Sequence, residues 1–493
     1  MIIPKSQTKE NFLGTTNIYA MSDTHQDTRK TSALLSQIIE EAPENTLVLN
    51  CGDMFKGIYP QDLERDVYLK MKEAQPNTKM VMTLGNNDFG FFKEHLDYLA
   101  NTVRMFAANG IDTVCANIFD KSGKRPDWIK PYSIVEIDGD KTLVTGMCID
   151  NINTAKFGII PKKPSEVVDE ISQAIKRENP DNVVLLNHDY KPASQKLVKE
   201  FAKKGVTIDL VIGGHDHEVV QPDTQLNIYH PQAFAESMYN IKLTNESGIK
   251  KVSEVKEIKN SNTPISEIFE DELTTYEDSA HLYKNIAKST LNLPKKYSEP
   301  CALGSFLADE MIKVADADIG FFSTGFLMKP LLYKPNSYIT NYIFQKTICA
   351  KNPIKTVNIT AEQLKKVFTN AFNSYGYGMS NPKFLQCSNN ITIIGKDIPE
   401  ESRFEVKQIL INDKPILDSN GNPLSDKTFK CVIDEFIANG GQNNTVLQEL
   451  EKTNVESDGE IVRIDQVLIN ALKQAEMEYP QGSEYPSFEI ITL

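Results

Sequence analysis

The feature that most constrains the fold is a set of apolar stretches that each lead into a residue able to bind a metal ion. The clearest is 210–217 (LVIGGHDH), in which an apolar run passes through two glycines to His215 and His217. The apolar run predicts a buried strand, and the glycines allow the chain to turn tightly at its end. Four other stretches share this form: 17–25, 46–53, 79–88 and 182–188.

The order of these stretches predicts an α/β fold. Helical patterns separate the stretches 17–25, 46–53 and 79–88. This β-α-β-α-β order implies right-handed crossovers in a parallel sheet. Residues 132–137 and 141–146 flank an Asp-Gly turn and predict a β-hairpin. Ligands of such sheets bind beyond the carboxyl ends of the strands. We therefore expect layered sheets flanked by helices, with the polar strand ends gathered at one edge.

The polar residues at these strand ends are Asp23, His25, Asp53, Asn86, His188, His215 and His217. Taken singly, each has an ordinary interpretation as a helix cap, a turn residue or a half-buried histidine. Together they use four of the seven histidines of the chain, which favours a metal centre. Carboxylate, amide and imidazole ligands without a thiolate suit Mn, Zn, Fe, Co or Mg. Because seven ligands are too many for one tetrahedral ion, we expect two divalent ions, with Asp53 on the middle strand as the bridging ligand.

Length, charge and cysteine content limit the remaining possibilities. A chain of 493 residues is too long for one core, so two domains and a connector are expected. The net charge of −14 argues against a nucleic-acid polymer as partner. Seven scattered cysteines without a C-x-x-C pair favour a reducing compartment, and no apolar run has the length of a signal-peptide core or a membrane span. We therefore expect a soluble cytoplasmic protein.

The pattern along the chain predicts three parts. Thr263 and Pro264 suit the start of a helix, and an acidic amphipathic pattern continues from them towards Pro294. Further on, Thr360 and Gln363 have the spacing of a helix capping box. The expected parts are a metal-binding domain at 1–262, a linker helix at 263–294 and a second domain at 295–493.

The spacing of the motifs resembles that of the calcineurin-like metallophosphoesterases. The family pattern is D-x-H, G-D, G-N-x-D, a single His and G-H-x-H, and all seven metal positions match. Three later stretches resemble the 5′-nucleotidase C-terminal domain: 303–309 (LGSFLAD), 384–388 (FLQCS) and 436–441 (FIANGG). The resemblance implies a four-layer α/β/β/α catalytic domain, a linker helix, and a second, α+β substrate-binding domain that rotates against the first.

The resemblance also implies a function and an assignment of ligands. The function is hydrolysis of a small phosphorylated substrate, such as a nucleotide, with Asp53 as the bridging ligand of a hydroxide-generating pair of ions. Each ion takes four ligands: Asp23, His25, Asp53 and His217 for one, and Asp53, Asn86, His188 and His215 for the other.

The chain departs from the family at the catalytic residues. Where the family has G-N-H-E-F-D, residues 85–90 read GNNDFG, so Asn87 stands at the catalytic His and Gly90 at the Asp that orients it. A positioned general acid typically contributes roughly 10²–10⁴ in rate, whereas the metal ions supply nucleophile and Lewis acid independently of it. We therefore expect slower hydrolysis of poor leaving groups rather than its loss. The sequence leaves open whether His95 or another group replaces the acid.

The substrate pocket departs as well. Where the family has N-G-G-G-I-R, residues 323–328 read STGFLM, so Met328 replaces an arginine. The first base-stacking Phe of the family falls at Ala350, while the second is kept as Phe436 and the Asp after the paired glycines becomes Gln442. Phe436 and Gln442 are the candidate substrate-binding residues, although Phe436 also suits an ordinary core position. These changes favour a phosphodiester or an activated phosphomonoester over AMP.

Three functions remain open from the sequence. The first is a dinuclear-metal-dependent phosphoester hydrolase. The second is a catalytically impaired, metal-containing protein that binds a ligand or partner, which the altered catalytic and pocket residues favour and the complete ligand set opposes. The third is a conventional nucleotidase with a different acid, for which AMP and a phenyl ester would be hydrolysed at comparable rates.

Overall fold

The computed structural model describes residues 14–493 apart from 43–45, 91–92, 138, 151–153, 156–157, 218, 247–248, 261–263, 374, 376–380, 382, 402 and 419. The chain divides into two compact units, Met1–Tyr276 and Glu277–Leu493. Each unit has a hydrophobic core of its own. Within the described part of the chain, no helix combines the length and the apolar character needed to cross a membrane.

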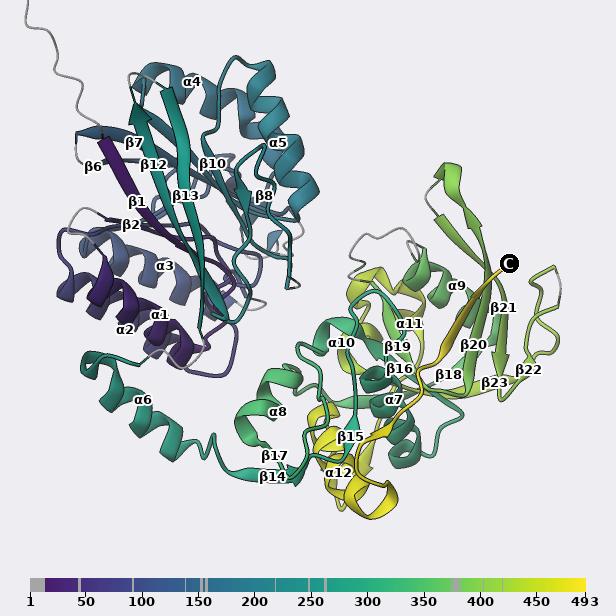
Figure 1. Cartoon of the computed structure of the whole chain (residues 1–493). Helices are drawn as coiled ribbons and strands as arrows, with labels where there is room; N and C mark the ends of the chain where they lie inside the picture. The colour runs from purple at the N-terminus through teal and green to yellow at the C-terminus, as the bar shows by residue number, and fades with distance from the viewer. Residues whose placement is uncertain are drawn as a thin grey trace, which may run out of the picture. The chain divides into compact units, whose positions relative to one another are not determined.

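The first unit is built on two β-sheets (Figure 1). The six-stranded sheet has the order β13 (Ile249–Lys259), β12 (Ser237–Glu246), β1 (Gly14–Met21), β2 (Thr46–Asn50), β3 (Lys79–Met82) and β4 (Ile111–Thr113). The five-stranded sheet has the order β11 (Ile228–Tyr229), β10 (Leu210–Gly213), β9 (Asn182–His188), β7 (Asp140–Cys148) and β6 (Tyr132–Ile137). A separate pair is formed by β5 (Ile118–Asp120) and β8 (Ile159–Pro161).

The strands that carry the metal-binding motifs run parallel to their neighbours. In the first sheet β1 pairs in parallel with β2 and β2 with β3, and in the second sheet β9 pairs in parallel with β7 and β10. Parallel pairing places the carboxyl ends of neighbouring strands at the same edge of a sheet. The predicted order of strands and helices and the predicted β6–β7 hairpin are both confirmed.

The two sheets pack against each other through one apolar core. Leu47 and Leu49 of β2 lie in this core with Val184 and Leu186 of β9, and all four are fully buried. Helices cover the outer faces (Figure 1): α1 (Thr28–Glu41), α2 (Gln61–Ala74) and α3 (Lys93–Ala108) on the six-stranded sheet, and α4 (Val168–Glu178) and α5 (Lys191–Lys203) on the other. β2 and β9 are buried along their whole length because each sheet is covered on both faces. The predicted four-layer α/β/β/α arrangement is confirmed.

The helix of the expected linker is shorter than the sequence pattern predicted. Helix α6 spans Glu267–Ser279, so it begins after Pro264, and Thr263 lies outside the described residues. Beyond it, β14 (Asn285–Lys288) pairs with β17 (Tyr338–Thr340), and β15 (Leu291–Asn292) pairs with β27 (Ser483–Glu484). The helix ends early because the residues before Pro294 pair with strands distant in the sequence, which helical periodicity does not reveal.

The second unit contains two further sheets. The five-stranded sheet has the order β19 (Leu385–Cys387), β16 (Ile319–Ser323), β23 (Thr428–Asp434), β18 (Ile354–Thr360) and β24 (Thr453–Asn454). The four-stranded sheet has the order β22 (Lys414–Pro415), β21 (Arg403–Ile411), β20 (Ile391–Ile398) and β28 (Glu489–Thr492). A small hairpin is formed by β25 (Glu456–Ser457) and β26 (Glu460–Ile461).

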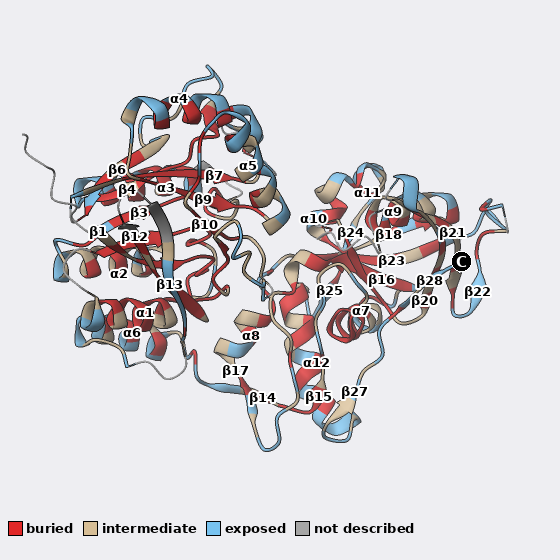
Figure 2. Cartoon of the chain, turned by 45° about the horizontal axis from the view of Figure 1, so that its top comes forward, coloured by how far each residue is buried: buried red, intermediate tan, exposed pale blue. Residues whose placement is uncertain are grey.

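Helices pack around these sheets and complete an α+β unit. They are α7 (Ala302–Ala315), α8 (Asn341–Thr347), α9 (Ala361–Phe372), α10 (Glu435–Ala438), α11 (Thr445–Glu449) and α12 (Ile464–Glu478). The predicted capping box starts α9: the Thr360 backbone N–H donates to Gln363 Oε1 over 2.9 Å, and the Gln363 N–H donates to the Thr360 hydroxyl over 3.3 Å. Figure 2 shows strands of both units as largely buried segments between helices with one exposed face.

Candidate metal centre and substrate-binding residues

The ends of β1, β2, β9 and β10 bring most of the predicted metal ligands together. The ligand atoms within each of two groups lie within 4.8 Å of one another: Asp23, His25, Asp53 and His217 in the first, and Asp53, His188 and His215 in the second. Asp53 belongs to both groups. The carboxylates and the imidazoles of His25 and His188 are buried, whereas His215 and His217 are partly exposed. The cluster is therefore accessible to solvent on the side of His215 and His217.

The distances between the candidate ligand atoms are close to those expected for atoms that bind the same ion. His25 Nε2 lies 2.9 Å from His217 Nε2, and His188 Nε2 lies 3.3 Å from Asp53 Oδ2. His217 Nε2 lies 3.6 Å from Asp23 Oδ1. Two ligands each about 2.1 Å from one ion are separated by roughly 3–3.5 Å. The separations therefore match a site in which one divalent cation touches several of these atoms.

Several buried polar atoms of the cluster have no hydrogen-bond partner. They are His25 Nδ1 and three further atoms, His188 Nε2, His215 Nδ1 and Asn86 Oδ1. A buried polar atom without a partner costs about 1–3 kcal/mol, so their presence in one place calls for an explanation. A divalent cation accepts lone pairs from imidazole nitrogen and amide oxygen, and it would satisfy the three further atoms. These residues therefore fit a metal centre.

Neighbouring groups hold the ligands in orientation. His188 Nδ1 donates to the Cys51 carbonyl over 2.6 Å, which directs Nε2 towards the cluster. The Ser22 hydroxyl donates to Asp23 Oδ2 over 2.5 Å. The buried Asp88 carboxylate accepts hydrogen bonds of 2.8 Å from the backbone N–H groups of Asp53, Phe55 and Gly85. Asp88 thus joins the loop after β2 to the loop after β3.

The loops adopt unusual backbone conformations. Four of the predicted ligands have positive φ: Asp23 (50°), His25 (50°), Asp53 (54°) and His215 (71°). Residues other than glycine rarely adopt such angles, and strain of this kind is concentrated at functional sites. At Gly85 a side chain would place its Cβ 2.1 Å from Asp53 Oδ1, which explains the glycine before Asn86.

Charges within the cluster shift its pKa values strongly. Burial alone would raise the pKa of Asp53, but the neighbouring His188 and His25 hold it well below the usual value. The same pairing outweighs burial at His188, where the Asp53 and Asp23 carboxylates raise the pKa to about 10. Burial, reinforced by a neighbouring imidazole, lowers the pKa of His25 and of His215 to about 4. His25 and His215 are therefore neutral near pH 7, the state in which imidazole binds metal.

Asn87, which the sequence comparison predicts to stand at the family's catalytic histidine, contacts the shared carboxylate directly. Its backbone N–H donates to Asp53 Oδ1 over 2.8 Å, and its side-chain Nδ2 donates to Asp53 Oδ2 over 2.6 Å. Lys56 Nζ donates to Asn87 Oδ1 over 3.0 Å. Sequence reasoning missed Lys56, although a lysine three residues after the bridging aspartate was a visible signal.

Gly90, which the sequence predicts to stand at the family's orienting aspartate, is tightly packed. Gly90 has φ of +62°, and a Cβ there would lie 2.6 Å from both Cβ and Nδ1 of His95. Contacts below 3.0 Å essentially never occur for real Cβ atoms. The exposed His95 side chain therefore fills the space that an aspartate at position 90 would need.

In the second unit, one of the two candidate substrate residues, Phe436, lies near a further aromatic ring. Phe436, at the start of α10, is 37% exposed, which does not fit an ordinary core position. Its ring centroid lies 6.1 Å from that of Phe326, a residue that sequence reasoning missed. Gln442 Nε2 donates to the Ser323 hydroxyl over 2.7 Å. Ala350, where the family has its other stacking ring, is buried at 5% exposure.

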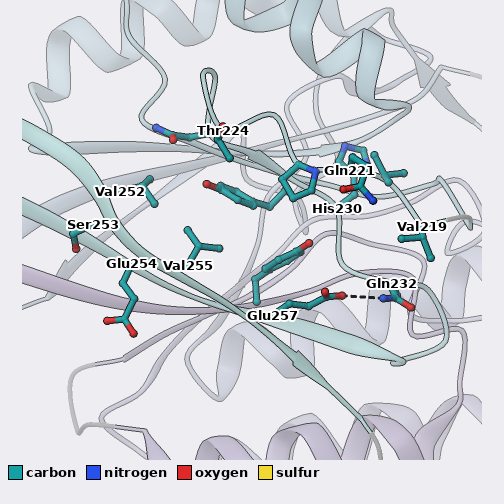
Figure 3. A pocket seen from close by; sticks show the side chains of 15 residues that line it. Val219, Gln221, Thr224, His230, Gln232, Val252, Ser253, Glu254, Val255 and Glu257 are labelled. Atoms are coloured by element: carbon teal, nitrogen blue, oxygen red, sulfur yellow. Dashed lines mark hydrogen bonds between the residues drawn. The ribbon is translucent and has the colours of Figure 1, made fainter.

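A separate cavity of about 560 Å³ lies beside β11, β12 and β13 in the first unit. None of the seven predicted metal ligands is among its lining residues. Figure 3 shows His230 in this lining, together with the hydrogen bond of 2.9 Å from Gln232 to Glu257. His230 Nδ1 lies 3.2 Å from Asp216 Oδ2, so the cavity adjoins the loop that carries His215 and His217 without being part of the cluster.

Comparison with known proteins gives two family matches. Residues 16–219 match the calcineurin-like phosphoesterase family, and residues 279–449 match the 5′-nucleotidase C-terminal domain. A 5′-nucleotidase of Diplobatis ommata is 23% identical over 500 residues, covering 89% of this chain and 80% of that protein. The trifunctional nucleotide phosphoesterase protein YfkN of Bacillus subtilis is 22% identical over 87% of this chain, and the match spans 32% of its own length.

Solved structures show the same architecture. The 5′-nucleotidase precursor from Thermus thermophilus superposes with a TM-score of 0.75 at 16% identity, covering 97% of this chain and 99% of the other. The sulfate thiohydrolase SoxB from the same species superposes with a TM-score of 0.73 at 14% identity, with 97% and 96% covered. At such identities the likeness extends to the fold and not to the reaction. Together with the strand-end cluster, the two family matches show that this chain belongs to the calcineurin-like phosphoesterases that carry a 5′-nucleotidase C-terminal domain.

Proposed function

We propose that this protein hydrolyses a small phosphomonoester or phosphodiester with two divalent metal ions, Mn, Zn, Fe, Co or Mg, bound at the strand-end cluster. The observation that carries the proposal is that Asp53 belongs to both groups of ligand atoms. A shared carboxylate is what a pair of adjacent ions requires, and paired ions are suited to in-line phosphoryl transfer. We assign Asn86 to the group that contains His188 and His215, because its buried amide oxygen has no other partner.

The residues of the cluster have distinct tasks in this proposal. Asp23, His25 and His217 would hold one ion, and Asn86, His188 and His215 the other, with Asp53 common to both. When bound, such ions supply a hydroxide nucleophile and neutralise charge on the phosphoryl group. In the reaction an oxygen–phosphorus bond forms, the bond from phosphorus to the alcohol oxygen breaks, and that oxygen departs with the electron pair and takes a proton from water.

Asn87 changes the way in which the leaving group is handled. An amide has no proton to give at neutral pH, and both N–H bonds of this residue that the structure shows are directed to Asp53. The departing oxygen therefore receives its proton from solvent. We expect aryl esters, whose leaving groups are stable anions, to be hydrolysed much faster than alkyl esters.

The second unit supports a substrate with an aromatic or otherwise flat group. Phe436 and Phe326 present neighbouring, partly exposed rings, and base stacking on such rings is worth roughly 1–3 kcal/mol. Gln442, held by Ser323, offers an amide beside them. These features support a nucleotide as a candidate substrate, in line with the names of the Diplobatis and Bacillus relatives.

A second function, metal-dependent binding without turnover, is favoured by one specific observation. Asn87 donates hydrogen bonds to both oxygens of the Asp53 carboxylate. A catalytic residue at this position would instead be directed at the substrate. In that case the cluster would hold metal and ligand, but hydrolysis would be negligible.

Hydrolysis of an aryl phosphomonoester and an aryl phosphodiester by the Mn²⁺-loaded protein tests the proposal. Asp53→Asn removes the shared carboxylate and should abolish turnover and lower the bound metal. Asp169→Asn, an exposed residue of α4 with the same change of charge, should alter neither. Absence of turnover in a chain that still binds about two ions would favour the binding protein, and turnover retained by Asp53→Asn would refute the proposed centre.

A further inference from the structure

We propose that Lys56 binds the anionic phosphoryl group of the substrate and so sets a preference for phosphomonoester dianions over phosphodiester monoanions. The inference rests on the proposed function, because it assigns a specificity-determining residue to the same site. Lys56 belongs to none of the sequence motifs, and its role is read from its contacts in the structure.

The first argument is the position of the ammonium group. Lys56 Nζ donates to Asn87 Oδ1 over 3.0 Å, and Asn87 Nδ2 donates to Asp53 Oδ2 over 2.6 Å. A single amide thus separates the positive charge from the carboxylate shared by both ligand groups. Where the family motif has an imidazole, this chain has an amide with a lysine directly behind it.

The second argument is that the backbone around Lys56 is fixed. The preceding Phe55 N–H donates to Asp88 Oδ1 over 2.8 Å, and the following Gly57 N–H donates to Gln26 Oε1 over 2.5 Å. Gly57 lies so close to the first metal loop that a Cβ would fall 1.5 Å from the His25 carbonyl oxygen. The backbone on both sides of Lys56 is therefore held by two loops of the cluster. This restricts the positions that its ammonium group can reach.

The third argument is accessibility combined with electrostatic contact. Lys56, Asn86 and Asn87 are all half-buried, whereas Asp23 and Asp53 are fully buried, so Lys56 lies on the open side of the cluster. Its ammonium group is separated from Asp53, the carboxylate shared by both ligand groups, by the Asn87 amide alone. A substrate anion that approaches Asp53 from solvent therefore meets this cation.

The chemistry of the substrate then determines the specificity. A phosphomonoester carries close to two negative charges at pH 7–8, because its second pKa is about 6, whereas a diester carries one. The attraction to a fixed positive charge is proportional to the charge of the anion, so it is about twice as large for the monoester. An ammonium group offers three N–H donors and can bond phosphoryl oxygens directly. Lys56 should therefore favour the monoester.

The alternative is that Lys56 only supports the loop that carries Asn87. Loss of such support would lower monoester and diester hydrolysis in the same proportion and would disturb metal binding. The two roles therefore differ in the ratio of the two activities, in metal content and in the affinity for a free phosphate ion.

The test uses the full chain loaded with Mn²⁺ and the variants Lys56→Gln and Lys56→Arg. Lys176→Gln is the matched control, since Lys176 is an exposed residue of α4. For Lys56→Gln we expect unchanged metal content and a loss of kcat/KM of about 10²-fold for the monoester, the size of effect seen when one donor to a developing charge is removed. The diester should lose tenfold or less, and Lys56→Arg should retain most of the preference.

Two further measurements supplement the comparison of the two hydrolysis rates at a single pH. Calorimetric titration of inorganic phosphate into the Mn²⁺-loaded chain should show about tenfold weaker binding for Lys56→Gln. The monoester disadvantage of Lys56→Gln should shrink below pH 6, where the substrate becomes a monoanion. An equal loss for both esters, unchanged phosphate affinity or a loss of metal from Lys56→Gln would each overturn the proposal. If the wild-type chain hydrolyses neither ester, the proposed function fails, and phosphate affinity alone decides the role of Lys56.

Discussion

The buried carboxyl group of Glu64 accepts a hydrogen bond of 2.9 Å from the hydroxyl of Thr24, the residue between Asp23 and His25. The hydroxyls of Thr28 and Thr31 also donate to Glu64, over 2.7 and 3.3 Å. Glu64 belongs to α2 and is fully buried. One carboxyl group of α2 thus fixes the loop that leads from β1 into α1.

This arrangement predicts a pH-dependent stability. Burial, only partly offset by the three hydroxyls, raises the pKa of Glu64 from 4.5 to about 7. Because the folded state favours the protonated form, this contribution to stability is complete below pH 4.5 and is lost as the pH rises through 7. The shift corresponds to roughly 3 kcal/mol at about 1.36 kcal/mol per pKa unit.

Glu64→Gln should remove that dependence, since an amide does not ionise. Relative to the wild type, we expect the free energy of unfolding of the metal-free variant to rise by about 3 kcal/mol between pH 5 and pH 8. Urea unfolding at several pH values measures the difference. Parallel curves for the two proteins would contradict the prediction.

Metal binding should release at least one proton per chain at pH 7.5, and a metal-bound water that becomes hydroxide would add to this count. Although burial acts in the opposite direction, Asp53 and Asp23 raise the pKa of His188 to about 10, so the metal-free chain holds a proton there. Metal binding requires the neutral imidazole, and the proton must leave. Calorimetry in two buffers of different ionisation enthalpy counts the protons. His281→Asn, at an exposed histidine, should leave the count unchanged, and a count of zero would contradict the prediction.

Gly90→Asp should destabilise the chain by about 1–3 kcal/mol, because the backbone has φ of +62° and the new Cβ would collide with His95. His95→Gly, at the start of α3, removes both the Cβ and the ring that cause the collision. Gly90→Asp should therefore cost less stability in the His95→Gly background than in the wild type. Thermal unfolding of the four proteins in this cycle measures the coupling, and additive effects would argue against the collision.

Phe436→Ala and Phe326→Ala should each raise KM for a nucleoside monophosphate about tenfold while changing KM for glycerol phosphate little. Loss of one stacked ring costs roughly 1–3 kcal/mol of base binding, and a substrate without a base does not use it. Phe429→Leu, at a buried ring of β23, is the matched control for loss of an aromatic residue. Equal effects on both substrates would show that the rings are structural.

Much of the first unit follows from local sequence. β2 and β9 are continuous apolar runs because both of their faces are covered. β9 ends at the predicted ligand His188, and β2 ends three residues before the predicted ligand Asp53. Parallel pairing of β1 with β2 then brings Asp23 and Asp53 to one edge, whereas His188 of β9 reaches them because the two sheets pack against each other through one apolar core. The capping box at Thr360 was also predictable, since all its contacts lie within four residues.

The features that were not predictable depend on distant contacts or on loop conformation. Helix α6 ends at Ser279 because β14 pairs with a strand more than fifty residues away, at Tyr338–Thr340. The contact of Lys56 with Asn87 joins loops from two different strands. Phe326 reaches Phe436 across 110 positions of sequence. In each case the local sequence pattern does not indicate the contact, because the contact depends on tertiary packing between distant parts of the chain.

The contact between Gly90 and His95 also imposes an order on the history of this motif. In a lineage that passes between the GNNDFG loop and the family's GNHEFD loop, residue 90 can change to aspartate only if residue 95 is a glycine or the first turn of α3 has moved. Substitutions at 90 and 95 are therefore tied in evolution. Among related sequences, an aspartate at the position of Gly90 should be found together with a different residue or a different helix start at the position of His95.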